Sequence, residues 1–143
     1  MGCVDVDTEK YKNEYGVYLS DNYSELPEDV SCETIVIDAQ YYSKKEIAEL
    51  KETNGTVLSY LNVGSIEDFR DYFPEYEDLI LGPYENWEEE YWVNVADERW
   101  QDFVVKDLAK PILNKGVDGF LLITPMSITI ITMMECIRDL PIF

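Results

Sequence analysis

The stretch Thr34-Ile35-Val36-Ile37-Asp38 decides the fold of this chain. Its first four residues are all β-branched, none of them is charged, and the run ends at a carboxylate. Strands of a parallel sheet that are buried on both faces have this continuous pattern, whereas half-exposed strands alternate apolar and polar residues. The run therefore predicts a central strand in an α/β protein.

The segments on either side of this strand fit a βαβ arrangement. Ser43-Lys44-Lys45-Glu46 has the form of a capping box, which predicts a helix from this point through Leu50. Asn54-Gly55 ends that helix, and residues 56–63 read as the next strand. A short apolar run at residues 16–19 predicts a strand before the central one.

The second half of the chain continues the alternation. The cap-like run Ser65-Ile66-Glu67-Asp68 predicts another helix start, and the aromatic and acidic residues 74–90 read as a loop with little regular structure. Residues 91–95 return to a strand. A further strand begins at residues 119–121, so about five strands are predicted, in a parallel sheet with right-handed crossovers.

A long helix is predicted between the last two strands. Asp97 caps it, and Trp100, Val104 and Leu108 recur every fourth residue, so they line its buried face. Pro111 is expected to kink or split the helix, and Lys115-Gly116 ends it.

The charge balance excludes two classes of partner. The 143 residues include 30 Asp and Glu against 11 Lys and Arg, for a net charge of -19. Such a surface repels phosphate backbones and anionic lipid, so we expect neither nucleic-acid binding nor direct binding to a membrane surface. It attracts a cationic ligand. Alternatively, the acidic residues serve only to keep the protein soluble. The composition fits both a cationic ligand and this purely solubilising role.

The absence of histidine narrows the chemistry further. No histidine is present, which excludes Ser-His-Asp catalysis, imidazole acid–base catalysis and histidine metal sites. The three cysteines, Cys3, Cys32 and Cys136, have no metal-type spacing and do not form an even disulfide set. We therefore expect no cofactor, and proton transfer falls to carboxylates, tyrosine or lysine.

Gly2-Cys3 resembles the end of a bacterial lipobox, in which the lipidated cysteine follows a small residue. This reading predicts lipidation at Cys3, a tether over residues 1–14, and an extracellular or cell-surface location. The membrane is then contacted only through the lipid anchor. A chance Gly-Cys pair is the alternative.

An ordered series of motifs resembles glycoside hydrolase family 114, the endo-α-1,4-polygalactosaminidase-like (β/α)8 barrels. The motifs are Tyr15-Gly16-Val17-Tyr18-Leu19-Ser20, Val36-Ile37-Asp38, Tyr42-Ser43, Tyr60-Leu61-Asn62-Val63-Gly64, Tyr91-Trp92-Val93-Asn94-Val95, Asp97, Trp100-Gln101 and Lys115-Gly116-Val117-Asp118-Gly119-Phe120. The resemblance covers residues 15–120. It implies an incomplete (β/α)8 barrel of a glycosidase that acts on a galactosamine-containing polysaccharide, a polymer that is cationic where it is deacetylated.

Active sites of such barrels lie at the C-terminal ends of the strands. The resemblance therefore places Asp21, Asp38, Asn62 and Asn94 on this rim. The residues predicted to bind substrate are Asp38, Tyr60, Asn62, Trp92 and Asp21.

Each of these residues has a structural alternative. Asp38 is the best candidate for a sugar-hydroxyl contact, with a turn aspartate as the alternative. Tyr60 and Trp92 stack on sugar rings or are plain core. Glu67 reads more as a capping residue than as a cleft residue. Trp87 lies in an acidic loop, either as part of a subsite for a cationic sugar or simply exposed to solvent.

The sequence changes character after Phe120. The family's next strand ends in Asp-Asn-x-Asp, which we take to supply a catalytic carboxylate, whereas this chain has Ile123-Thr124-Pro125-Met126. Reading each codon from Ile123 one base earlier permits Asp-Asn-Thr-Asp-Val-Tyr-Tyr, which is the family pattern. Residues 121–143 are therefore expected to be an aberrant tail produced by a frameshift.

Two expectations follow from this tail. The chain is expected to be truncated and inactive as a polygalactosaminidase; the alternative function is a non-catalytic carbohydrate-binding surface lipoprotein. An open sheet edge and an apolar tail also predict self-association.

Overall fold

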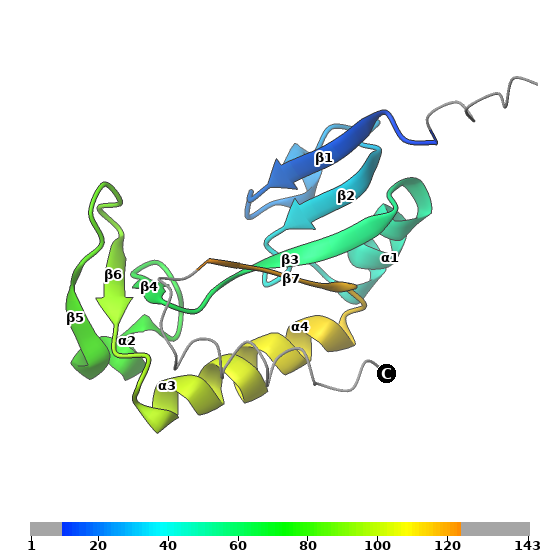
Figure 1. Ribbon diagram of the computed structural model, residues 1–143. Helices are drawn as coiled ribbons and strands as arrows, with labels where there is room; N and C mark the ends of the chain where they lie inside the picture. Colours follow the sequence, from blue (N-terminus) through cyan, green and yellow to red (C-terminus); the bar gives the residue numbers. More distant parts are fainter. Residues whose placement is uncertain (1–9, 124–143) are drawn as a thin grey trace, which may run out of the picture.

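The computed structural model describes residues 10–123, and a parallel four-stranded sheet lies at its centre (Figure 1). The strands are β1 (Asn13–Tyr18), β2 (Cys32–Ile37), β3 (Thr56–Asn62) and β7 (Gly119–Ile123), in that spatial order. Each neighbouring pair is parallel, with Val36 opposite both Val17 and Leu58. The predicted α/β class is confirmed, and Ile35, Val36 and Ile37 of β2 are fully buried as predicted.

Helices cover one face of this sheet. Helix α1 (Lys44–Thr53) begins with the predicted capping box, in which Ser43 Oγ accepts from the Glu46 N–H and the Glu46 carboxylate accepts from the Ser43 N–H. Ile47 of α1 belongs to the same buried core as Ile35 and Val57 of the sheet. The short 3₁₀ helix η1 (Tyr23–Glu25) connects β1 to β2.

The opposite face of the sheet is only partly covered among the residues that the structure describes. Tyr15, Val17 and Leu19 of the β1 segment and Ile123 of β7 are exposed although they are large and apolar. In a closed barrel this face is the interior, and side chains fill it. The described part of the chain thus presents one covered sheet face and one that is buried at Val36 but exposed along β1 and at Ile123.

The predicted long helix runs in three segments: α3 (Glu98–Asp102), the π-helical η3 (Phe103–Ala109) and α4 (Lys110–Asn114). Asp97 caps it by accepting from the Arg99 N–H, and Trp100, Val104 and Leu108 are buried, as predicted. The π-helical segment η3, whose turns are wider than those of an α-helix, ends at Ala109. Pro111 lies in the first turn of α4, where its missing backbone N–H is tolerated. Gly116, with φ of 107°, follows the helix end.

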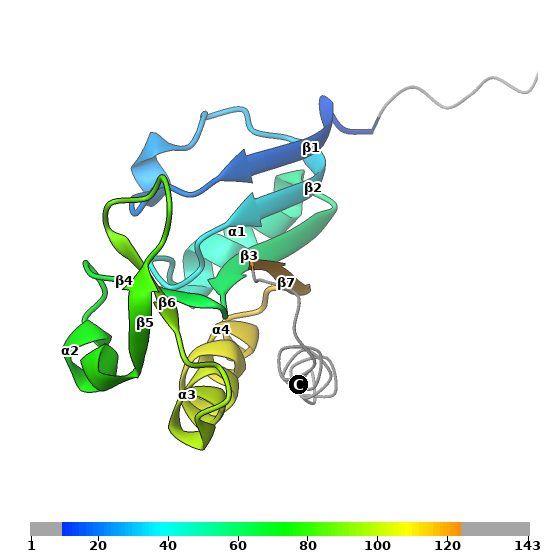
Figure 2. The same cartoon turned by 60° about the vertical axis from the view of Figure 1, so that its left-hand side comes forward.

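A second, antiparallel sheet follows β3 in the chain and lies beside the C-terminal ends of the parallel strands (Figure 2). It contains β4 (Ser65–Glu67), β5 (Ile80–Pro83) and β6 (Glu90–Val93), in the order β4-β6-β5. The one-turn helix α2 (Phe73–Tyr76) and the 3₁₀ helix η2 (Glu77–Leu79) lead into β5.

This sheet corrects three expectations. Ser65 does not start a helix: its hydroxyl accepts from Asn62 Nδ2 and is unavailable as a cap, and the segment pairs with β6 instead. Residues 74–90 are not an irregular loop, since they include most of α2 as well as η2 and β5, and Phe73 of α2 packs against Tyr91 of β6. The strand expected at residues 91–95 exists as β6 but is antiparallel, so the parallel sheet has four described strands instead of about five.

The two ends of the chain lie partly outside the described residues. Residues 1–9, including Cys3, and residues 124–143 are not described. Strand β7 continues through Ile123, so the first three residues of the segment 121–143 belong to the parallel sheet. Between residues 10 and 123, no helix has both the length and the apolar character needed to cross a membrane.

Candidate functional site

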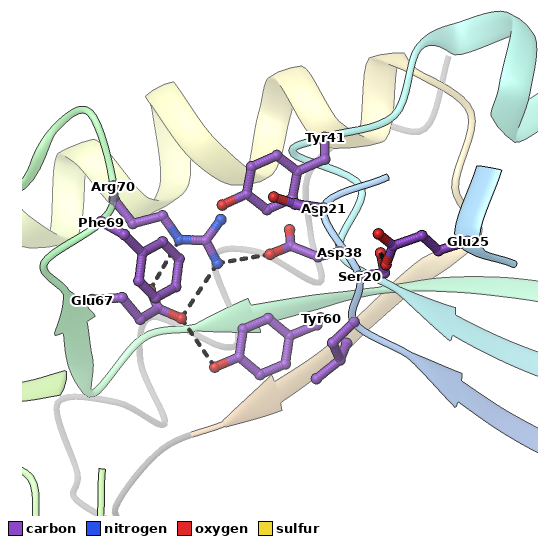
Figure 3. Close-up of a pocket in the computed structure, with 10 residues that line it drawn as sticks. Ser20, Asp21, Glu25, Asp38, Tyr41, Tyr60, Glu67, Phe69 and Arg70 are labelled. Atoms are coloured by element: carbon purple, nitrogen blue, oxygen red, sulfur yellow. Dashed lines mark hydrogen bonds and ion pairs between the residues drawn. The ribbon is translucent and has the colours of Figure 1, made fainter. Parts of the chain in front are cut away.

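A pocket of about 650 Å³ opens at the C-terminal ends of β1, β2 and β3, facing the antiparallel sheet (Figure 3). Its lining combines carboxylates, aromatic rings and one arginine. The lining residues are Leu19, Ser20, Asp21, Glu25, Asp38, Tyr41, Tyr60, Glu67, Phe69 and Arg70. Three of the five residues predicted to bind substrate, Asp21, Asp38 and Tyr60, therefore lie in one pocket.

Asp38 directly follows β2 and is almost completely buried. Its Oδ1 accepts from the Gln40 N–H at 3.2 Å, and its Oδ2 accepts from Arg70 Nη2 at 2.7 Å. Burial raises the pKa of Asp38 above its usual range, although the Arg70 charge acts in the opposite direction. One oxygen thus fixes the turn after β2, and the other faces the cation in the pocket.

Arg70 also binds Glu67, the last residue of β4. Its Nε lies 3.1 Å from Glu67 Oε2 and its Nη2 lies 3.3 Å from Glu67 Oε1. Tyr60 donates its hydroxyl to the same Oε1 at 3.3 Å, as Figure 3 shows. Burial raises the pKa of Tyr60, so its hydroxyl stays protonated and acts as a donor at neutral pH. We call Asp38, Arg70 and Glu67 the ion-pair cluster.

The guanidinium of Arg70 lies between two rings. Its Cζ is 5.2 Å from the Tyr41 ring centroid and 5.1 Å from that of Phe69, both within the range of cation–π attraction. Burial disfavours the charge, but the hydrogen bond to Glu67 and the charge of Asp38 raise the pKa of Arg70. The ion-pair cluster is therefore a fixed, charged wall of the pocket.

The wall that follows β1 is acidic and more open. Asp21 is exposed, and Ser20 donates its hydroxyl to the Glu25 carboxylate. Neither Asp21 nor Glu25 forms a salt bridge with a cation among residues 10–123. Counting Asp38 and Glu67, four carboxylates line a pocket that contains one arginine, so the pocket attracts positive charge.

Asn62 and Trp92, the other two residues predicted to bind substrate, do not line the pocket. Asn62 holds the turn between β3 and β4: its Nδ2 donates to Ser65 Oγ at 2.6 Å and its Oδ1 accepts from the Ser65 N–H at 3.2 Å. Trp92 lies in β6, where its ring packs against Tyr84 with centroids 4.1 Å apart. Trp92 is therefore part of the antiparallel sheet and not of a barrel wall.

The expected rim position of Asn94 is wrong, because it follows β6 and not a strand of the parallel sheet. Its Oδ1 accepts from the Ala96 N–H at 3.2 Å, which shapes the entry to α3. Trp87, in the turn between β5 and β6, is exposed.

Sequence reasoning missed most of the ion-pair cluster. Glu67 was interpreted as a capping residue, and Arg70, Tyr41 and Phe69 were not singled out. The spacing of Glu67 and Arg70, three residues apart, was the available signal, but it marks a charge pair without showing where the pair lies. In the described part of the chain, no group of three acidic or cysteine side chains is arranged to hold a metal ion.

The solved structures that resemble this chain include the following three. Ega3 of Aspergillus fumigatus, in complex with galactosamine, has 18% identity and a TM-score of 0.72, over 91% of this chain and 55% of its own. The glycoside hydrolase domain of PelA from Pseudomonas aeruginosa has 15% identity and a TM-score of 0.60, over 89% and 52%. The maltogenic α-amylase AmyB from Thermotoga neapolitana has 10% identity and a TM-score of 0.62, over 88% and 42%.

These identities are low, so the likeness establishes the fold alone, that of part of a (β/α)8 barrel. The chain spans about half the length of the first two structures, which agrees with the expected incomplete (β/α)8 barrel. A comparison with curated proteins gave no match. The model of glycoside-hydrolase family GH114 matches residues 6–122, the span that carries the motifs described above. The chain belongs to glycoside-hydrolase family GH114.

Proposed function

We propose that this chain binds a galactosamine-containing polysaccharide of the kind cleaved by endo-α-1,4-polygalactosaminidases. The observation that carries the proposal is the pocket at the C-terminal ends of β1, β2 and β3, where carboxylates and aromatic rings occur together. Family membership supports it, as does the Ega3 structure, which holds galactosamine. The net charge of -19 favours a polymer that carries free ammonium groups.

The pocket offers two kinds of contact to such a sugar. Asp21 and Glu25 supply negative charge without a bound cation in the described residues, so they suit an ammonium group. In the ion-pair cluster the two carboxylates share the single positive charge of Arg70, and their remaining lone pairs suit hydroxyl groups. Tyr41 and Phe69, both exposed, provide apolar ring faces for the sugar.

We propose further that these residues bind the sugar without cleaving it. Glycoside cleavage normally needs two carboxyl groups, about 5–5.5 Å apart for retention. Asp38 Oδ2 and Glu67 Oε1 contact the same Nη2 atom of Arg70, at 2.7 and 3.3 Å, so their separation cannot exceed about 6 Å. This limit allows the spacing for retention, but both groups are ion-paired with Arg70, whose charge opposes protonation even though burial raises the pKa of Asp38.

The position of Ile123 supports the loss of activity. It is the last residue of β7 and pairs with Asn62 at the end of β3, beside the pocket. An apolar side chain thus occupies the strand end where the family pattern leads us to expect a carboxylate. We attribute this to a frameshift, and the nucleotide sequence around the codons for residues 120–123 tests that explanation.

A surface location completes the proposal. Lipidation at Cys3 would hold the chain at the cell surface as a carbohydrate-binding lipoprotein; Cys3 lies outside the described residues, and the motif Gly2-Cys3 supports the assignment. Metabolic labelling with a lipid precursor, compared between the chain expressed with its natural upstream sequence and a Cys3→Ser variant, tests it.

The main experiment measures binding and cleavage separately. Titration calorimetry with deacetylated α-1,4-linked galactosamine oligomers is expected to show binding, and a reducing-end assay is expected to show no cleavage. Asp38→Asn is expected to weaken binding at least about tenfold, since it alters a buried charged group that contacts Arg70. Asp102→Asn is the matched control, because Asp102 is exposed and pairs only with Lys106 in the next helical turn.

Absence of binding by the unaltered chain, or equal loss in both variants, would contradict the binding proposal. Cleavage that disappears in Asp38→Asn would instead show that the ion-pair cluster is catalytic. Circular dichroism of each variant confirms that it is folded.

A further inference from the structure

The turn between β5 and β6 presents a tryptophan to solvent from an ordered backbone. Trp87 is 63% exposed. The Tyr84 N–H donates to the Glu90 carbonyl at 2.8 Å, and the Glu90 N–H donates to the Trp87 carbonyl at 3.1 Å. Asn86 adopts the left-handed conformation with φ of 73°, as tight turns require. The exposure of Trp87 is therefore a property of a defined turn.

The base of the hairpin is fixed by other aromatic residues. Tyr84 packs against Trp92, and Phe73 of α2 packs against Tyr91 with ring centroids 5.7 Å apart. These contacts connect the hairpin to the rest of the molecule without using Trp87, which is absent from the buried core. The indole of Trp87 is therefore available to contact a ligand without loss of core packing.

The hairpin turn adjoins the pocket. The Asp68 N–H donates to the Glu89 carbonyl at 2.9 Å, and Asp68 lies between Glu67 and Phe69, which both line the pocket. Figures 1 and 2 agree that the turn lies on the side toward which the C-terminal ends of β1 and β2 point. A polymer that leaves the pocket past Phe69 thus approaches the hairpin.

The charge of the turn complements a cationic polymer. Glu85, Glu88 and Glu89 are exposed beside Trp87, and residues 80–93 contain no lysine or arginine. An ammonium group near an indole ring gains cation–π attraction, and the indole face also packs against the apolar C–H face of a sugar. Together, the exposed ring and the uncompensated acids select an amino sugar over a neutral one.

We infer that the β5–β6 turn is a second binding platform, on which Trp87 stacks against a sugar unit outside the pocket while the neighbouring glutamates attract its ammonium group. The occupant is a further unit of the same amino-sugar polymer, so the inference rests on the proposed function. The platform makes affinity depend on chain length, because a short oligomer that fills the pocket does not reach the turn.

The test compares a disaccharide with a long deacetylated galactosamine polymer by titration calorimetry. Trp87→Ala is expected to weaken polymer binding about two- to fivefold, the range of an exposed cation–π contact, and to leave disaccharide binding unchanged. Trp87→Phe is expected to retain most of the polymer affinity. Leu81→Ala is the matched control, since Leu81 is 70% exposed on β5 of the same hairpin but lacks a ring.

The outcomes separate the two proposals. Disaccharide and polymer binding by the unaltered chain, with equal polymer affinity in Trp87→Ala, overturns the platform and leaves the pocket intact. Equal weakening for both ligands also overturns it, because the residue then acts on the pocket. Equal loss in Leu81→Ala shows that any change in the hairpin has this effect, which also overturns the platform. No binding of either ligand by the unaltered chain overturns both proposals.

Discussion

Replacement of Arg70 by methionine tests the ion-pair cluster most directly. The Arg70 side chain is only 5% exposed and binds Asp38 Oδ2 at 2.7 Å and Glu67 Oε2 at 3.1 Å. Methionine keeps a long apolar side chain between Tyr41 and Phe69 but removes the charge and the hydrogen-bond donors. Two buried carboxylates then lose their common cation.

The expected cost at pH 7 is about 3–5 kcal/mol, the range found when one partner of a buried ion pair is removed. No reduction for solvent screening applies, because both carboxylate side chains are also only 5% exposed. Domains of this size have a total stability of about 5–15 kcal/mol, so the loss amounts to at least about a fifth of the stability and is large enough to measure.

The penalty is expected to shrink in acid. Burial already raises the pKa of Asp38, and loss of Arg70 removes the main opposing influence. A carboxyl group whose pKa is higher in the folded than in the unfolded state binds more protons when folded, so stability falls as the pH rises through the interval between the two values. As the pH falls from 7 toward 3.8, the pKa of an aspartate in the unfolded state, protonation of Asp38 therefore reduces the stability that the variant has lost.

Urea unfolding of the variant and the unaltered chain, at pH 7 and at pH 5, measures this difference. Arg99→Met is the matched control: Arg99 also contacts two carboxylates, but it is 56% exposed, and the change is expected to cost far less than Arg70→Met because solvent screens exposed ion pairs. The triple variant Asp38→Asn, Glu67→Gln, Arg70→Met is expected to recover part of the loss, since no buried charge remains. A loss below about 1 kcal/mol at pH 7 would refute the reasoning, and so would a loss that does not decrease at pH 5.

Three further changes test other parts of the structure. Tyr42→Phe is expected to leave the stability to urea unchanged or raise it by up to about 1 kcal/mol, because the buried Tyr42 hydroxyl has no hydrogen-bond partner among residues 10–123; a clear loss would reveal a partner. Gly55→Ala is expected to lower the thermal midpoint by the equivalent of about 1–3 kcal/mol, since a Cβ there would lie 2.5 Å from the Glu33 carbonyl oxygen; an unchanged midpoint would show that the backbone yields easily. The exposed apolar side chains of Tyr15, Val17 and Leu19 are expected to cause self-association. This association is expected to increase with salt, because salt screens the repulsion from a net charge of -19 beyond about 8 Å. A monomeric mass by light scattering at high protein concentration, with and without salt, would contradict this.

The parts of the fold that the sequence predicted correctly depend on local patterns. The run Ile35-Val36-Ile37, the capping box at Ser43 and the spacing of Trp100, Val104 and Leu108 each report their surroundings within a few residues. Each of these patterns is typical of one kind of secondary structure, so strands β1 to β3, helix α1 and the long helix were predictable.

The antiparallel sheet was not predictable in the same way. Ser65-Ile66-Glu67-Asp68 fits a helix cap, and only its pairing with Glu90, Tyr91 and Trp92, more than twenty residues later, makes it a strand. Pairing over such a distance leaves no signature in either segment alone. The candidate site was hard to predict for the same reason. Glu67 lies in β4 of the second sheet and Arg70 follows three residues later, so the position of this sheet determines that Arg70 contacts Asp38.

The pocket is shared between two independently hydrogen-bonded sheets, and this has a consequence for folding. Asp38 and Tyr60 come from the parallel sheet, whereas Glu67 and Arg70 come from β4 and the segment after it. Any state in which the parallel sheet has formed but the antiparallel sheet has not docked against it lacks the pocket. A ligand for the pocket binds only the docked state and stabilises it by mass action. Recovery of ligand affinity during refolding therefore times the docking of the two sheets, a step to which backbone circular dichroism is nearly blind.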